Sequence, residues 1–361
     1  MAPVDPSDTA SAGDSESTSE TYSDDRALFA RPVSSAWLET IDSVARTVLG
    51  PHDRLGDALV NEVASLSELY TRGRGALREQ SAVLAARLRF FLPRDLPKIE
   101  GPLSELAWAG AFPGRAGSAL RVLDLGAGLG TTTLGVASIA ARLSAPPSHL
   151  EVIAVERDAR SLDVMQVLAA RCGRGVLEGE TLPVQVSARE LDLERGFGSL
   201  RVGERFDLIV MGLALNELFV DRAHEERIQR RAHFLTEATS RLAPGGALVV
   251  IEPALREATR ELQEVRGAIA TAENANIFGP CTHDAPCPLL VRERDWCHED
   301  LPLSLPEPLA TLARGAGLRF EGLTYAYLTL RAEPLRCAPG ASRIRWPPRL
   351  RAATLPHLAA I

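Results

Sequence analysis

The densest group of residues that could do chemistry is the segment "CTHDAPCPLLVRERDWC", residues 281–297. It holds Cys281, Cys287 and Cys297, three of the five cysteines in the chain. An odd number of cysteines argues against a disulfide framework. Thiolates are the ligands that zinc and iron–sulfur clusters prefer. The spacing matches neither a paired C-x-x-C zinc site nor a compact ferredoxin run. We therefore expect a metal site here, with three unliganded thiols as the alternative.

A fourth ligand is needed to close a tetrahedral zinc site or a four-iron cluster. The candidates are Cys337, His283 and His298, and Cys337 is the only cysteine downstream of the segment. Cys172 falls in a predicted helix, where a small buried hydrophobic role is expected.

A second group of chemically informative residues is the glycine-rich stretch "VLDLGAGLGTTTLG", residues 122–135. An apolar strand reaches Asp124, and Gly126, Ala127, Gly128 and Gly130 follow before a helix begins. Glycine lets the backbone turn sharply and approach a ligand without a Cβ clash. Dinucleotide folds show G-x-G-x-x-G, whereas the pattern here is D-x-G-x-G-x-G. This pattern resembles motif I of class I S-adenosylmethionine-dependent methyltransferases, in which the loop wraps the methionine and ribose parts of the cofactor.

Candidate ligand contacts lie at the ends of the strands that follow. Glu156 ends "LEVIAVE" and could accept both ribose hydroxyls, although nicotinamide enzymes use an acid in the same way. Ser187 and Ala188 are expected after the third strand, beside the adenine. Asn216 and Glu217, in "GLALNELF", are expected to face the substrate and are the candidate catalytic residues. The alternative for them is structural, with Asn216 capping a helix and Glu217 in its first turn.

Alternating strand and helix patterns place these residues in an α/β fold of the class I methyltransferase (Rossmann-like) type, a doubly wound parallel sheet. Expected strands are 119–128, 150–156, 182–188, 206–215, 247–253 and 318–332. Expected helices are 37–49, 55–70, 78–92, 159–172, 225–242, 254–273 and 307–317. The predicted organisation is an acidic disordered tail (1–25), a helical region (26–115), a core (116–335) with a cysteine-rich insertion (276–300), and a basic tail (336–361).

Charge is distributed unevenly along the chain. Its formal net charge is −7, and residues 1–25 hold seven acids and no lysine or arginine, so the remainder is formally neutral. The basic C-terminal end includes Arg343, Arg345, Trp346 and Arg349, which could bind RNA by charge and stacking or form a solvated tail. No apolar run is long enough to span a membrane, and no secretory or transit signal is recognisable. We expect a cytoplasmic monomer with no membrane and no DNA partner.

A family resemblance rests on "NIFGPCTHDAPCPL" followed by "RDWCH", after "VLDLGAGLG" and "GLALNEL". Together with "RLRFFLPRDLPKIEGPLSEL", these stretches resemble the methyltransferase-like family of small-subunit ribosome assembly, known from mitochondria and with bacterial relatives. The resemblance implies contact with small-subunit ribosomal RNA. It also implies a 4Fe-4S cluster, for which Cys281, Cys287 and Cys297 would be three ligands and Cys337 the candidate fourth. Zinc is the alternative metal. In the family the fourth cysteine tends to lie in a later C-terminal strand. This chain ends "RIRWPPRLRAATLPHLAAI" without such a cysteine, so that final strand is expected to be missing or weak.

Three functions are weighed for a chain with these motifs. The first is transfer of the methyl group of S-adenosylmethionine to a base of small-subunit ribosomal RNA. The second is an assembly factor that binds the cofactor and RNA without turnover, because no recognisable catalytic motif follows the fourth strand. The third is a small-molecule methyltransferase, which would not associate with RNA.

Overall fold

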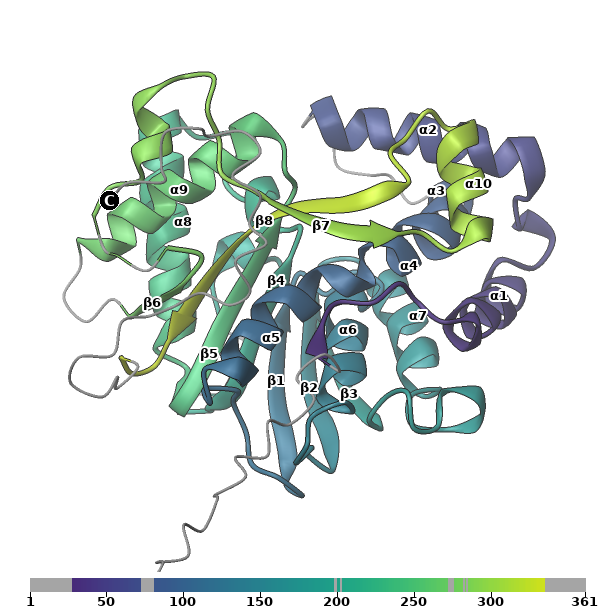
Figure 1. The fold of residues 1–361 in the computed structure, drawn as a ribbon, viewed down its shortest axis with the longest axis horizontal. Helices are drawn as coiled ribbons and strands as arrows, with labels where there is room; N and C mark the ends of the chain where they lie inside the picture. The colour runs from purple at the N-terminus through teal and green to yellow at the C-terminus, as the bar shows by residue number, and fades with distance from the viewer. Residues whose placement is uncertain are drawn as a thin grey trace, which may run out of the picture.

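The central sheet determines where the candidate site can lie (Figure 1). A computed structural model of the chain describes residues 28–72, 81–197, 200–201, 203–271, 276–281, 283 and 285–334. Within these ranges eight strands form one mixed sheet. They are β1 (Ala119–Leu125), β2 (His149–Glu156), β3 (Val184–Glu190), β4 (Phe206–Gly212), β5 (Leu242–Glu252), β6 (Ile277–Gly279), β7 (Glu299–Ser304) and β8 (Glu321–Arg331).

The strand order is β3-β2-β1-β4-β5-β8-β6, with β7 paired to β8 outside this path. Strands β1 to β5 are mutually parallel, as the alternation of strands and helices predicts. β8 lies antiparallel between β5 and β6. The order reverses between β1 and β4, and the carboxyl ends beside such a switch point are where open α/β sheets bind ligands.

The C-terminal part of the sheet holds one predicted strand and two that were not predicted. β8, a long and well-buried strand inside the sheet, confirms the strand expected over 318–332. The later strand that was expected to be missing or weak lies outside the described residues. The short β6 supplies the far edge beside β8 and was not predicted. β7 was also missed, because "EDLPLS" carries two acids and a proline, and its pairing partner lies beyond α10.

Helices cover both faces of the sheet. The α-helices are α1 (Ser35–Leu49), α2 (Gly56–Arg72), α3 (Ser81–Ala86), α4 (Leu92–Asp95), α5 (Glu100–Trp108), α6 (Thr131–Ala140), α7 (Ala159–Ala169), α8 (His224–Thr239), α9 (Arg256–Ala270) and α10 (Glu307–Gly315). Apolar residues of α8 and α9 pack against one face, and those of α5, α6 and α7 pack on the other. Among the described residues, no helix is long and apolar enough to cross a membrane.

The helical region before the sheet begins with a capped helix and ends in one continuous run. Ser34 caps α1 by accepting a hydrogen bond from the Trp37 N–H at 3.3 Å. From α3 to α5 the chain stays helical through a π-helical turn, η3 (Arg87–Phe91), and a 3-10 turn, η4 (Leu96–Ile99). Pro93 has no N–H to donate back along the helix, which accounts for a disturbed hydrogen-bond ladder at this place.

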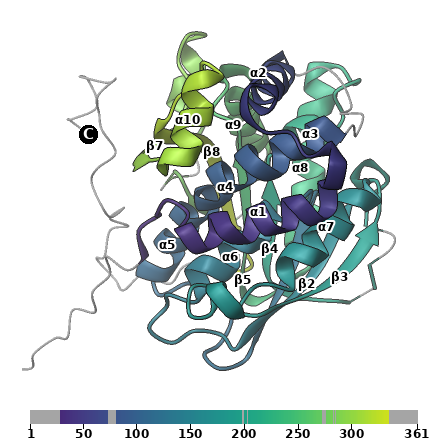
Figure 2. The same ribbon diagram turned by 90° about the vertical axis from the view of Figure 1, so that its right-hand side faces the viewer.

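The helical region is fastened to the sheet by a shared apolar core. α1 lies across α7 in Figure 2, and buried residues of both helices belong to one cluster. The same cluster includes Leu309 of α10, so the last described helix packs against the first ones. The helical region is therefore part of the same packed unit as the glycine-rich loop and not a separate appendage.

Candidate functional site

The glycine-rich loop leaves the end of β1 at the switch point of the sheet. Gly126, Gly128 and Gly130 have φ angles of +73°, +52° and +85°, the left-handed region that glycine adopts without strain. The Gly126 and Ala127 N–H groups donate to the Val155 carbonyl at 2.8 and 2.9 Å. A Cβ on Gly126 would lie 2.6 Å from the Ala214 Cβ. Glycine is therefore required there both for its backbone angle and for close approach of the next loop.

Asp124 lies beneath this loop and is fully buried. Its Oδ2 accepts a hydrogen bond from the Thr133 hydroxyl at 2.6 Å, and its Oδ1 is buried without a partner among the described residues. Burial raises the pKa of Asp124 to about 7, against the lowering effect of the hydrogen bonds from Thr133. The Asp124 carboxyl therefore links the end of β1 to the first turn of α6, the two elements that the loop connects.

Glu156 is the acid at the tip of β2, and it lies beside the same loop. Its Oε2 accepts from the Gly128 N–H at 3.0 Å, and its Oε1 accepts from the Arg157 and Asp158 N–H groups. The two sequence features predicted to bind one cofactor are thus adjacent in space. Their arrangement fits a ribose held by an acid next to a glycine cradle.

Ser187 does not lie after the third strand, as the sequence analysis expected. It is an exposed residue within β3, where its Cα partner is Ile153 of β2. The strand continues to Glu190, whose partner is Glu156. β3 is the edge of the sheet, so charged side chains at its end do not disrupt it, and an apolar-alternation rule ends the strand too early.

The loop after β4 reaches over the glycine-rich loop and holds the two predicted catalytic residues. Asn216 lies within the 3-10 turn η7 (Leu215–Glu217), whose N-cap is Ala214, so Asn216 does not cap a helix. The Asn216 Oδ1 is buried and has no hydrogen-bond partner in the described part of the chain. The Glu217 carboxylate is half exposed and lies 3.9 Å from the Arg157 guanidinium. The loop thus offers one acceptor and one ion-paired acid.

Two buried residues that the sequence analysis missed hold this loop in place. Glu252, at the end of β5, accepts from the Leu215 and Asn216 N–H groups at 3.0 and 3.1 Å. Burial raises the pKa of Glu252 to about 8, and the charge of Arg231 opposes this. Arg231 donates to the Leu218 and Asn216 carbonyls at 3.0 and 2.8 Å. The only signal in the sequence was Glu252 itself, an acid at the end of an apolar strand.

The loop is also the most strained part of the described backbone. Leu213 and Phe219, at its two ends, have φ angles of +56° and +58° and are the only described residues other than glycine with positive φ. Such conformations cost about 1–3 kcal/mol each and concentrate at functional sites. Strain that is held by Glu252 and Arg231 supports a functional role for the loop after β4.

The cysteine segment, residues 281–297, is attached to α9. Cys287 is buried, and Cys281 and Cys297 are half-buried. Arg266 donates to the His283 and Ala285 carbonyls. Arg260 donates to four more carbonyls, those of Leu289, Leu290, Arg292 and Asp295.

The described residues do not form the metal site that was predicted for the cysteine segment. Within them, no three Cys, His, Asp or Glu side chains lie close enough together to hold a metal ion. The thiols as placed therefore do not fit a cluster. Cys337, the candidate fourth ligand, lies outside the described residues, as do Arg343, Arg345, Trp346 and Arg349. Cys172, by contrast, is buried in the core, and burial raises the pKa of its thiol to about 12.

The family can now be identified. Residues 118–356, about two thirds of the chain, match the family model described as mitochondrial small ribosomal subunit Rsm22. The chain belongs to this family. No curated protein matches it in sequence. The family match, the glycine-rich loop and the order of the sheet together confirm the predicted class I methyltransferase fold. The helical region that covers the loop lies outside the matched range.

Solved structures that resemble the chain include several methyltransferases at low identity. An arsenic(III) S-adenosylmethionine methyltransferase from Chlamydomonas reinhardtii is 20% identical, with 63% of this chain and 67% of that one covered and a TM-score of 0.31. A precorrin-6Y C5,15-methyltransferase from Geobacter metallireducens is 14% identical, with 63% and 86% covered and a TM-score of 0.32. A human methyltransferase 10 domain containing protein is 10% identical, with 66% and 83% covered and a TM-score of 0.36.

Proposed function

We propose that this protein binds S-adenosylmethionine in the glycine-rich loop and methylates a base of small-subunit ribosomal RNA. The observation that supports the proposal most is that Gly126, Gly128 and Glu156 lie next to one another and next to the loop after β4. The chain also belongs to a small-ribosomal-subunit family. The partner is the small subunit and its RNA, which a monomer would contact in the cytoplasm. The base must be single-stranded or splayed out to reach the site.

Methyl transfer requires the side chains mainly to position the reacting groups. A nitrogen or carbon of the base forms a bond to the methyl carbon as the carbon–sulfur bond breaks, and the electron pair stays on sulfur. The protein aligns the partners and excludes water. Asn216, whose Oδ1 is an unused buried acceptor, would orient an amino group of the base. Glu217 would take the proton that the base loses, and Ser187 is too far back along β3 to be retained as an adenine contact.

The decisive experiment measures labelled methyl transfer from S-adenosylmethionine to purified small subunits and their assembly intermediates. Wild-type protein is expected to transfer the label to RNA. Asn216→Ala and Glu217→Gln are expected to lower the rate while keeping cofactor affinity, because neither touches the glycine-rich loop in the described contacts. Arg46→Gln, a change on the exposed face of α1, is the matched control.

A second candidate function, assembly without turnover, is favoured by one observation. The strand-end acid Glu252 is 1% exposed and both its oxygens accept from backbone N–H groups, so burial leaves this acid to hold the loop and not to face a substrate. Tight cofactor binding with no transfer to any intermediate would support this function over methylation. A small-molecule methyltransferase would instead fail to crosslink to ribosomal RNA.

We further propose that Cys281, Cys287, Cys297 and Cys337 bind a 4Fe-4S cluster, with zinc as the alternative metal. Support comes from the soft donors gathered in one segment and from the two arginines that hold its backbone, since groups around a site orient its ligands. The described positions would have to rearrange on binding. Anaerobically purified protein should contain about four irons per chain, or one zinc. Protein that contained neither metal would refute the site, and Cys172→Ser is the control that should leave the metal content unchanged.

A further inference from the structure

Arg87 of the helical region lies over the glycine-rich loop. Its Nη1 donates to the Ser161 hydroxyl at 3.1 Å, at the start of α7. Its Nη2 lies 3.2 Å from where a Cβ on Gly128 would be, and it is the nearest described atom to that position. The guanidinium therefore faces the middle glycine of the loop from a segment 41 residues earlier in the chain.

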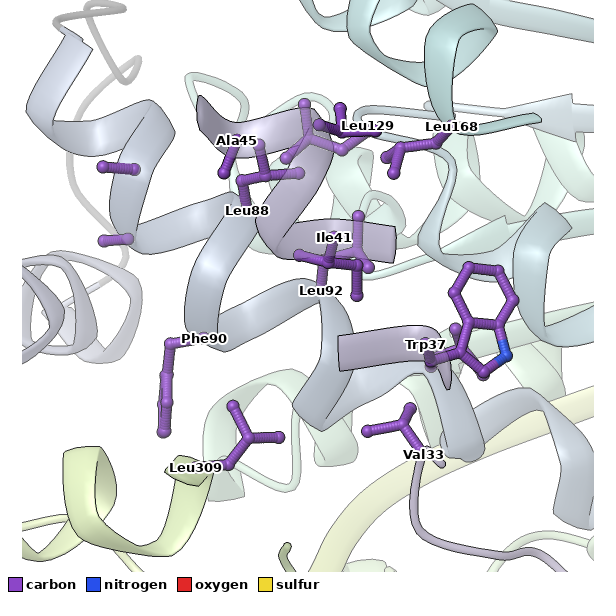
Figure 3. Packing of buried hydrophobic residues seen from close by; sticks show 14 of the residues in the cluster. Val33, Trp37, Ile41, Ala45, Leu88, Phe90, Leu92, Leu129, Leu168 and Leu309 are labelled. Carbon is purple, nitrogen blue, oxygen red and sulfur yellow. The ribbon is translucent and has the colours of Figure 1, made fainter. Parts of the chain in front are cut away.

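Two features fix Arg87 in this position. It is the first residue of the π-helical turn η3, and the Leu92 N–H donates to its carbonyl, five residues back. Its neighbour Leu88 is fully buried in the cluster that also contains Leu129, which lies between Gly128 and Gly130 (Figure 3). Single π-helical turns are frequent at functional sites. The helix and the loop thus share one apolar cluster beside the guanidinium.

The charge of Arg87 also reaches the loop after β4. Burial raises the pKa of Tyr70, in α2, to about 12, and the nearby Arg87 acts against this rise. Burial likewise raises the pKa of Glu217, and the charges of Arg157 and Arg87 oppose it. Arg87, which contacts α7 and faces Gly128, is therefore also close enough to Glu217 for its charge to act on the pKa of that carboxyl.

The neighbouring arginines have a different, structural use. Arg89 forms ion pairs with Asp42 and Asp53 at 2.6 and 2.5 Å. Arg94 lies over the Phe90 ring and 3.7 Å from Asp95. Both arginines make their contacts within the helical region. Arg87, by contrast, extends out of this region and onto α7 and the loop.

We propose that Arg87 recognises the carboxylate of the amino-acid part of the cofactor. The assignment rests on the proposed binding of S-adenosylmethionine. A planar guanidinium binds a carboxylate through two parallel hydrogen bonds, and the glycine-rich loop is where the methionine part is expected. The helical region then supplies a ligand-binding residue to a site whose other parts come from the sheet.

The test compares two ligands that differ in this carboxylate. S-adenosylhomocysteine carries the amino-acid part, and 5′-methylthioadenosine lacks it. Affinities are measured by calorimetry for the full chain and for Arg87→Gln, Arg87→Lys and Arg94→Gln. Arg87→Gln should weaken S-adenosylhomocysteine binding by roughly 10- to 100-fold, the range for a lost charge-assisted pair. It should leave 5′-methylthioadenosine binding unchanged. Arg87→Lys should lose less, and Arg94→Gln should change neither affinity.

The outcomes separate this proposal from the one it rests on. If Arg87→Gln weakened both ligands equally, or neither, carboxylate recognition by Arg87 would be wrong while cofactor binding stood. If the unaltered chain bound neither ligand, both proposals would be wrong. Circular dichroism melting of each variant shows whether a loss of affinity reflects unfolding, and a folded Arg87→Lys variant keeps the comparison valid.

Discussion

Leu129 gives the most direct way to test whether the helical region braces the cofactor loop. Its side chain is 4% exposed and packs in the cluster with Leu88, Ile41 and Leu92 (Figure 3). Leu129→Ala should remove about 3 kcal/mol of unfolding free energy, within the range for buried leucines, and lower the melting temperature by roughly 5 °C.

The same substitution should also weaken cofactor binding. If about half of the lost energy had held the loop in its binding geometry, the affinity for S-adenosylhomocysteine would fall about tenfold, since about 1.4 kcal/mol corresponds to a factor of ten. The matched control is Leu309→Ala, a leucine of α10 that is 2% exposed in the same cluster but outside the loop. It should cost similar stability and leave affinity within about twofold. Equal effects of both variants on affinity would refute the idea that the helices position the loop.

Three further predictions concern the groups around the site. Asp124 has its pKa raised to about 7 in the folded chain, so its stabilising contribution is present below about pH 4 and is lost as pH rises through 7. Denaturant unfolding of wild type and of Asp124→Asn is measured at pH 5 and pH 8. The unfolding free energy of wild type, relative to that of Asp124→Asn, should fall by a few kcal/mol between the two pH values, because one pKa unit corresponds to about 1.4 kcal/mol. A constant difference would show that Asp124 ionises as an ordinary aspartate does. Glu252→Gln leaves the Leu215 or Asn216 N–H without its acceptor. The substitution should lower the unfolding free energy by about 1–3 kcal/mol and speed hydrogen exchange at these two amides. Unchanged exchange would contradict this role of Glu252. Gly126→Ala should abolish cofactor binding because its Cβ would meet Ala214, whereas Gly245→Ala, at a similar φ of +76° with open space, should only lose stability. Equal binding by the two variants would mean that the close approach is unimportant.

The sequence was most informative where the signal is local. The parallel strands β1, β2, β4 and β5 are apolar runs bounded by turns, and the glycine spacing located the loop together with Asp124 and Glu156. These features depend on neighbours in the chain, so pattern alone recovers them. The end of β3 was misplaced because an edge strand tolerates charge at its exposed positions.

What could not be predicted depends on contacts between distant residues. Nothing in the sequence around Arg87 says that its guanidinium lies at Gly128, because that contact depends on the packing of the apolar cluster that includes Leu88 and Leu129. The clamp of Glu252 and Arg231 on the loop after β4 is equally non-local. The cysteine segment gave a metal hypothesis from residue types alone, and the described positions do not assemble such a site.

The cluster that joins Trp37 and Leu88 to Leu309 and Leu323 has a consequence for how the chain matures on the ribosome. Its earliest members leave the exit tunnel long before the α10 and β8 segments that complete their packing have been synthesised. β8 must also pair with both β5 and β6, so this end of the sheet cannot form before β8 has been synthesised. Contacts of such large sequence separation slow folding. Nascent chains should therefore expose the apolar face of α1 until synthesis is nearly finished, which makes this helix the natural binding site for a chaperone.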